Sequence, residues 1–195
     1  GREKYWDGSI YEGTWKNGLK DGNGVLQIPE ISVRYKQTWK NGILKSGKDI
    51  ERNQNGDIFF DGEYKNNLRD GYGIERHDDG TIFDGYWKRG LRHGKGVLYD
   101  SDRTYNQTWK RGGIKHGTVV ERNQNGTVVY EGEYRDNKRG GYGTEYYENG
   151  CRYTGHWKNG LKHGRGVLYI LNTNESYKEK WENGKIINSE SVQMQ

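Results

Sequence analysis

The chain has 195 residues, enough for one ordinary domain, and a formal net charge of +5 at pH 7. Only 30% of its residues are hydrophobic and the mean hydropathy is −1.24, so composition alone would favour disorder. The lone Cys151 excludes an internal disulfide framework, and no apolar run approaches the roughly 20 residues that span a bilayer. We therefore expect a cytoplasmic location, at the cytoskeleton or at the inner membrane surface.

We divide the chain into a lead-in (1–8), a repeat array (9–187) and a polar tail (188–195) that we expect to fray. The only methionine is Met194, so residue 1 is not an initiator and we expect a segment of a larger protein. The array is defined by two aromatic residues four positions apart, a pair that recurs eight times. Its first members are Tyr11, Tyr35, Phe60, Phe83, Tyr105, Tyr130, Tyr153 and Tyr177, and its second members are Trp15, Trp39, Tyr64, Trp87, Trp109, Tyr134, Trp157 and Trp181. A fixed period of about 24 residues predicts an array of small, similar modules rather than a disordered chain.

Each repeat is predicted to consist of a strand, a turn, a second strand and a second turn. In the first repeat Tyr11, Gly13 and Trp15 alternate, so they share one face of a strand, with the rings flanking a bare glycine. Gly22 and Gly24 share one face of the next segment, and we expect a neighbouring ring to lie on this stripped backbone. The stretch 16–18 between them has the composition of a hairpin turn, in which asparagine and glycine supply a positive φ.

The repeats also follow a longer rhythm of three. In the second, fifth and eighth repeats, the strand glycine is replaced by Gln37, Gln107 and Glu179. A ring cannot lie on glutamine as it lies on glycine. We therefore expect packing to change at every third repeat, bending or twisting the array there.

The pattern resembles the MORN (membrane occupation and recognition nexus) repeat, whose signature is Y-x-G-x-W-x-x-G-x-x-x-G-x-G. The resemblance covers about residues 9–184. It implies an all-β fold, an elongated single-layer twisted antiparallel sheet of stacked hairpins that carries a groove. It also implies a non-enzymatic scaffold or adaptor that binds a partner protein. Family roles at cytoskeleton, cilia, membrane contacts and motor cargo remain open, as does an accessory module of a larger enzyme.

Catalytic and cofactor motifs are absent from the sequence. His93, His116 and His163 occupy one turn slot, directly before a glycine, and their spacing follows the repeat rather than zinc-ligand spacing. No Ser/His/Asp or Cys/His arrangement stands out, and the G-x-G pairs do not extend to phosphate-binding loops. We expect no enzyme activity, no cofactor and no metal.

Basic residues follow each second aromatic and should align on one edge of a stacked array as a basic ridge. Solubility is one interpretation, and attraction to anionic phospholipid or an acidic partner is the other. Nucleic acid is disfavoured because the aromatic and basic residues are phased for folding. The ridge residues are Lys65, Arg69, Lys88, Arg89, Arg92, Lys110, Arg111, Lys115, Arg135, Lys138 and Arg139.

Five tyrosines are not required by the repeat and are candidates for a groove that binds a partner-protein segment. They are Tyr72, Tyr86, Tyr99, Tyr142 and Tyr169. Tyrosine is favoured at interfaces, although ordinary cross-strand pairing in a sheet is an equal alternative. Association into a homodimer is also plausible, because the ends of a repeat array expose unpaired strands.

Overall fold

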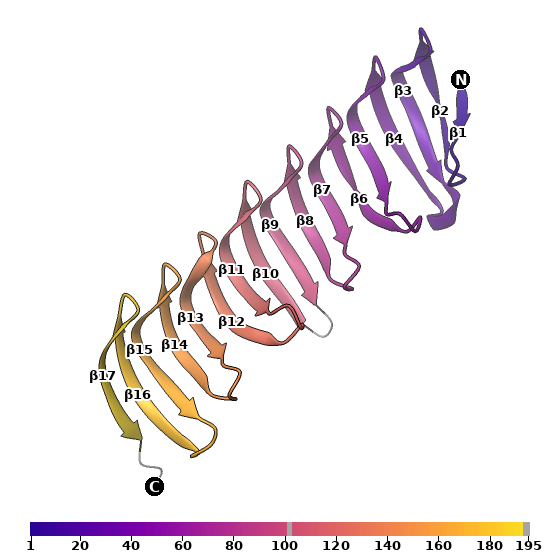
Figure 1. The fold of residues 1–195 in the computed structure, drawn as a ribbon. Coiled ribbons are helices and arrows are strands. Elements are labelled where there is room, and N and C mark those ends of the chain that lie inside the picture. Colours follow the sequence, from indigo (N-terminus) through magenta and orange to yellow (C-terminus); the bar gives the residue numbers. More distant parts are fainter. Residues whose placement is uncertain (101–102, 193–195) are drawn as a thin grey trace. The chain divides into compact units, whose positions relative to one another are not determined.

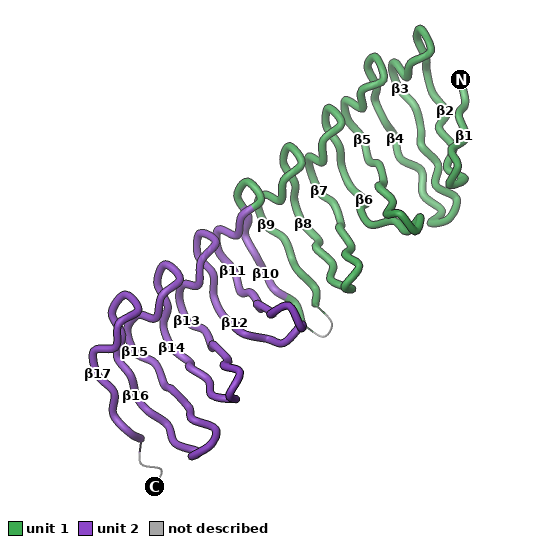
Figure 2. Tube along the Cα trace, in the orientation of Figure 1, with its two compact units in different colours: residues 1–104, 110–112 green, residues 105–109, 113–195 purple. Residues whose placement is uncertain are grey.

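A computed structural model describes residues 1–100 and 103–192 as antiparallel β-strands that follow one another in chain order (Figure 1). The chain divides into two compact units: unit 1 holds residues 1–104 and 110–112, and unit 2 holds residues 105–109 and 113–195 (Figure 2). The described residues form no α-helix, and a single 3-10 turn, η1 (Pro29–Ile31), follows the third strand. The fold is all-β, as the repeat pattern predicts.

The first nine strands belong to unit 1. They are β1 (Arg2–Lys4), β2 (Ile10–Lys16), β3 (Leu19–Ile28), β4 (Val33–Lys40), β5 (Ile43–Arg52), β6 (Ile58–Lys65), β7 (Leu68–Arg76), β8 (Ile82–Lys88) and β9 (Leu91–Asp100). The remaining strands are β10 (Arg103–Lys110), β11 (Gly113–Arg122), β12 (Val128–Arg135), β13 (Lys138–Tyr146), β14 (Arg152–Lys158), β15 (Leu161–Ile170), β16 (Glu175–Glu182) and β17 (Lys185–Val192). From β1 to β9, and again from β11 to β17, each strand pairs antiparallel with the next.

The turn that follows each second aromatic has a positive φ at both central residues. Asn17 and Gly18 have φ of 50° and 75°, and the other turns repeat this geometry. Two consecutive positive φ angles define the tight hairpin turn whose twist matches that of paired strands. The predicted hairpins are thus confirmed, and Arg89 (φ 51°) and Arg111 (φ 53°) adopt the conformation that asparagine or aspartate takes in the other turns.

The core of each unit lies on one side of its strands, which we call the ring face. It carries the fully buried rings of Tyr11, Phe60 and Phe83 in unit 1 and of Tyr130 and Tyr153 in unit 2. Each ring covers two glycines on paired strands. A Cβ added to Gly73 would lie 2.6 Å from Cζ of Phe60 and one added to Gly62 would lie 2.7 Å from it. The expectation that rings lie on bare glycine backbone is confirmed.

Packing changes where glutamine replaces the strand glycine. The hydrogen-bonded register of β4 and β5 stops at Gln37 opposite Gly47, and beyond that point the two strands are not paired. Gln37 is buried and its Nε2 donates to the carbonyl of Lys48 at 2.8 Å, while its Oε1 accepts from Trp39 Nε1 at 3.1 Å. Gln107 makes the matching bond to the carbonyl of Thr118 at 3.0 Å. The glutamine side chain therefore replaces a backbone hydrogen bond that is lost between the two strands. The predicted bend of the array stays a prediction.

Both ends of the array extend further than the sequence suggested. In the lead-in, β1 pairs with β2. In the tail, β17 pairs with β16 from Lys185 to Val192, so residues 188–192 are part of a strand rather than frayed. Residues 188–191 are all polar, so no alternation of polar and apolar side chains marks this part of the strand in the sequence. Residues 193–195 lie outside the described part of the chain.

Candidate functional site: two faces and a pocket

The predicted groove tyrosines of unit 1 lie on one surface, opposite the ring face. We call this side of each unit the tyrosine face. Tyr72 on β7 lies opposite Tyr86 on β8, with ring centroids 5.8 Å apart in an edge-to-face arrangement. Tyr99 on β9 lies opposite Ile82 on the same face. Tyr86 is 54% exposed, so these rings form a cross-strand pair that solvent still reaches.

In unit 2, Tyr142 and Tyr169 lie on the corresponding face. Tyr142 on β13 is 52% exposed and meets the ring of His156 on β14 with centroids 5.4 Å apart. Tyr169 on β15 lies against the guanidinium of Arg152 at 4.5 Å. Beside Tyr142 is an open hollow of about 630 Å³ that extends across β13 to β17. Tyr142 lines this hollow, whereas Tyr169, the other predicted groove tyrosine of unit 2, does not.

Eight of the predicted ridge residues are exposed at the turns between paired strands. In unit 1 they are Lys65, Lys88, Arg89, Lys110 and Arg111, and in unit 2 they are Lys115, Arg135 and Lys138. Two of the unit 1 turns are in contact, because the N–H of Gly112 donates to the carbonyl of Arg92 at 3.0 Å. Lys88, Arg89, Lys110 and Arg111 thus lie on neighbouring turns of one unit.

The other three predicted ridge residues, Arg69, Arg92 and Arg139, do not belong to an exposed ridge. The side chain of Arg69 is 14% exposed and bonds Glu51 at 2.8 Å and Glu75 at 2.7 Å on the ring face. Its guanidinium carbon lies 3.9 Å from the ring centroid of Phe60. Arg92 shares Glu75 at 2.6 Å. These cations are held by carboxylates and ring faces, so their role is in packing.

Arg139 repeats this arrangement in unit 2. It bonds Glu121 at 2.8 Å and Glu145 at 2.6 Å, and it lies 4.3 Å from the ring of Tyr130. The sequence contains a signal for this role: a basic residue five positions after the second aromatic in each glycine-pair repeat. These residues are Lys20, Arg69, Arg92, Arg139 and Lys162. In the other three repeats the same position holds Leu44, Ile114 and Ile186.

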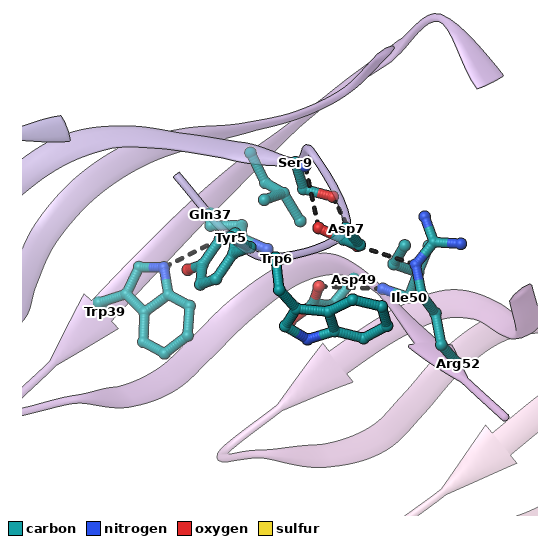
Figure 3. Close-up of a pocket in the computed structure, with 10 residues that line it drawn as sticks. Tyr5, Trp6, Asp7, Ser9, Gln37, Trp39, Asp49, Ile50 and Arg52 are labelled. Carbon is teal, nitrogen blue, oxygen red and sulfur yellow. Dashed lines mark hydrogen bonds and ion pairs between the residues drawn. The ribbon is translucent and has the colours of Figure 1, made fainter. Parts of the chain in front are cut away.

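The ring face of unit 1 also contains a pocket of about 340 Å³ that sequence reasoning missed (Figure 3). The loop between β1 and β2 contributes Tyr5, Trp6 and Asp7 to its wall. Trp39 comes from the paired part of β4, and Asp49 comes from β5 beyond Gly47, where the pairing of β5 with β4 has ended. The pocket forms where the hydrogen bonds between β4 and β5 end. A local sequence pattern does not predict such an end, so the pocket could not be found from the sequence.

The turn histidines have a structural role at one position at least. The N–H of Asn183 donates to Nδ1 of His163 at 3.4 Å, as the N–H of Asn41 donates to Asp21 Oδ2 at 3.1 Å in the first repeat. Within the described residues, no group of three or more histidine, cysteine, aspartate or glutamate side chains is placed to hold a metal ion. No helix in the described ranges is long and apolar enough to cross a membrane.

Comparison with known proteins gives one family and a set of partial relatives. The MORN repeat profile matches residues 11–30, 60–82, 83–105, 130–152 and 153–170, just over half of the chain. These are the five repeats whose ring covers a glycine pair. Alsin from Rattus norvegicus is 35% identical over 77 residues, and alsin from Homo sapiens is 34% identical over 77 residues. Each match covers 37% of this chain and 4% of alsin, so the chain spans only a small part of the length of these relatives.

Proposed function

This chain belongs to the MORN repeat family, and from that premise we propose that it is a non-enzymatic scaffold whose tyrosine face holds an extended segment of a partner protein. The observation that carries the proposal is the hollow beside Tyr142 in unit 2. It offers an exposed ring and the 40% exposed Val167 within a shallow concave surface. Tyrosine is one of the residues that supply most of the binding free energy at protein interfaces when they lie at the centre of the surface.

Charge around the hollow selects the kind of segment. Arg165, Lys178 and Lys180 line it and are exposed, and among the described residues no carboxylate pairs with them. Glu190 is the one acidic residue that lines the hollow from the same face, because Glu179 is buried and bonds Trp181 on the ring face. We therefore expect an acidic segment with at least one large apolar side chain.

A displayed library of random peptides, selected on the intact chain, tests this function. We expect enrichment of acidic peptides with an aromatic or aliphatic anchor. Their affinity, measured by fluorescence anisotropy, should fall about tenfold in Tyr142→Ala, since an interface tyrosine contributes about 1–2 kcal/mol. The matched control is Tyr146→Ala, because Tyr146 is also exposed on β13 but does not line the hollow. Equal affinity for the two variants, or a library that yields no specific binder, would refute the proposal.

The turns of unit 1 favour a second candidate function, attachment to an anionic membrane surface. Lys88, Arg89, Lys110 and Arg111 present four exposed charges on neighbouring turns, each worth about 1 kcal/mol near an anionic bilayer. Sedimentation with vesicles, with and without anionic lipid, tests it. Reversal of Lys88 and Arg89 to glutamate should abolish binding to anionic vesicles. Arg92 must stay intact in this experiment because it belongs to the ring-face network. Binding that persists after the reversal excludes this surface.

A further inference from the structure

The pocket on the ring face of unit 1 combines two residues that depart from their counterparts in the other repeats. Its first departure is Trp6, in the loop that joins β1 to β2. The N–H of Tyr5 bonds the carbonyl of Ser9 at 2.9 Å, and the loops at 77–81 and 147–151 make the same bond. Asp78 and Glu148 occupy the position of Trp6 in those loops. Trp6 is 84% exposed, so its side chain contributes little to the stability of the fold. The equivalent loops form with an acidic residue at this position.

The second departure is Asp49 on β5. Asp49 lies opposite Gly62, as Val119 lies opposite Gly132 in unit 2. Val119 is 8% exposed and packs in a cluster with Tyr130 and Tyr153. A carboxylate at a position where an equivalent strand buries valine costs free energy unless it is paired. The pocket therefore contains a charge that folding does not require.

The charges around Asp49 leave it available to a ligand. Its Oδ1 accepts the N–H of Ile50 at 2.9 Å, and no cation among the described residues lies within ion-pair distance of it. Arg52 is held by Asp7 at 2.8 Å and by Glu30 at 2.7 Å. Lys20 bonds Glu3 at 3.1 Å and the hydroxyl of Tyr5. Arg52, which lines the pocket, and Lys20, whose charge acts on Asp49, are thus already paired with other groups.

The walls of the pocket are suited to a flat cation. Tyr5, Trp6 and Trp39 line the pocket together with Asp49, and Trp6 is drawn next to Asp49 (Figure 3). Ring faces attract cations, tryptophan most strongly. The same part of the sheet already holds one such cation, because the ammonium of Lys20 lies 4.5 Å from the ring of Tyr11 and 4.6 Å from that of Trp39. A guanidinium stacks on aromatic rings, bonds a carboxylate through two N–H groups and is less strongly hydrated than an ammonium.

We propose that this pocket binds an arginine side chain of a partner polypeptide, with the guanidinium between Trp6 and Trp39 and bonded to Asp49. At about 340 Å³ the pocket is near the lower limit for small-ligand sites, about 300 Å³, and suits one long side chain rather than a folded surface. The site lies in unit 1 on the ring face. It is therefore separate from the hollow beside Tyr142, and the two functions fail or hold independently.

The test is a titration of the intact chain with a blocked, glycine-flanked arginine peptide, followed by the indole N–H resonances of Trp6 and Trp39. The matched peptide contains citrulline, which keeps the shape of arginine and lacks its charge. We expect saturable shifts of both resonances with the arginine peptide and at least a tenfold weaker response with citrulline. Equal responses to the two peptides, or no saturable shift with either, would overturn the proposal.

Two variants separate binding from folding. Asp49→Val restores the residue of the equivalent strand, so it should raise the melting temperature while it abolishes the response to arginine. Trp6→Glu restores the residue of the equivalent loop and changes an exposed side chain, so it should fold normally and lose at least tenfold in affinity. Binding of the arginine peptide to both folded variants as to the wild type would also overturn the proposal.

Discussion

At the scale of single residues, the contact between a ring and two glycines is the smallest unit of this fold. Gly62 and Gly73 face each other on β6 and β7 under the ring of Phe60. Neither glycine has a positive φ, so space and not backbone conformation requires the missing side chain. Stability in these strands therefore depends on a close approach that one methyl group would prevent.

Gly73→Ala tests this contact. The added Cβ meets Phe60 Cζ at 2.6 Å, so the ring must move, and we expect a loss of about 2–3 kcal/mol in the free energy of unfolding. The control is Gly56→Ala, a turn glycine with φ 89° and no atom within 4 Å of the added Cβ, which should cost about 1 kcal/mol. Phe60→Leu combined with Gly73→Ala should cost less than the sum of the two changes. Additive losses in urea titrations would show that the ring and the glycine are not coupled.

Asp49 gives a prediction about pH. Burial raises the pKa of Asp49 to about 6, while the Ile50 N–H and Lys20 offset part of that rise. The folded state thus binds the proton more tightly than the unfolded state, where the pKa is near 3.8. The cost of the charge is present in full above about pH 6 and disappears as the pH falls toward 3.8. Charged or titratable neighbours come from every adjoining element. They are Tyr5 and Asp7 from the loop, Lys20 from β3, Tyr35 from β4, Glu51 and Arg52 from β5, and Tyr64 from β6.

We therefore expect the melting temperature of Asp49→Val to exceed that of the wild type by more at about pH 7.5 than at about pH 5. Taking the difference between the two proteins cancels the titration of groups that they share. Asp49→Asn should follow the same trend with a smaller gain, because the amide stays polar. A gap that does not vary with pH would mean that Asp49 ionises as it does in water.

At the scale of strands and turns, the sequence predicted the repeating parts and missed those that depend on a neighbouring strand. Tyr11 and Gly13 alternate within one strand, and Asn17 and Gly18 are adjacent, so local rules were sufficient for both. The burial of Arg69 was missed because its two carboxylate partners come from different strands, β5 and β7. The same limit applies to the pocket beside Asp49, because Asp49 lies on β5 just beyond Gly47, where the pairing of β4 with β5 has ended.

The network of Arg69, Glu51 and Glu75 can be tested as an element. Removing the guanidinium in Arg69→Ala leaves two half-buried carboxylates short of a partner, so we expect a loss of about 2–3 kcal/mol. Burial alone would raise the pKa of Glu51 and of Glu75, but bonds to Arg69, Tyr64 and Arg92 hold both pKa values below the usual one. This stability is present above about pH 4.5 and is lost as the pH falls through the lower folded pKa.

Chemical denaturation at about pH 7 and about pH 3 measures this loss. The difference between wild type and Arg69→Ala should shrink at the lower pH. Lys65→Ala, at an exposed ridge position in the same hairpin, is the matched control and should change stability by less than about 0.5 kcal/mol. If the two variants lose equal stability, Arg69 belongs with the exposed ridge after all.

At the scale of the whole molecule, every described strand pairing joins neighbours in the sequence, and the rings of Phe60 and Tyr130 pack against rings of the adjacent repeat. Phe60 contacts Tyr64 and Trp87 at centroid distances of 5.8 Å and 5.2 Å, all in unit 1, and Tyr130 contacts Trp157 at 5.3 Å, all in unit 2. In an array with only neighbour contacts, stability is close to a sum over repeats and their interfaces. The two compact units should therefore not depend on each other to fold.

We expect a fragment of residues 1–100 to fold alone and to keep the arginine response of Trp6 and Trp39. Its circular dichroism should show β-structure, and its urea transition should be cooperative with a smaller slope than that of the intact chain, because less surface becomes exposed on unfolding. The cut leaves β9 as an unpaired edge, which favours association, so sedimentation at several concentrations must accompany the measurement. A fragment that is unfolded without urea, while the intact chain is folded, would show that the repeats are coupled over more than their neighbours.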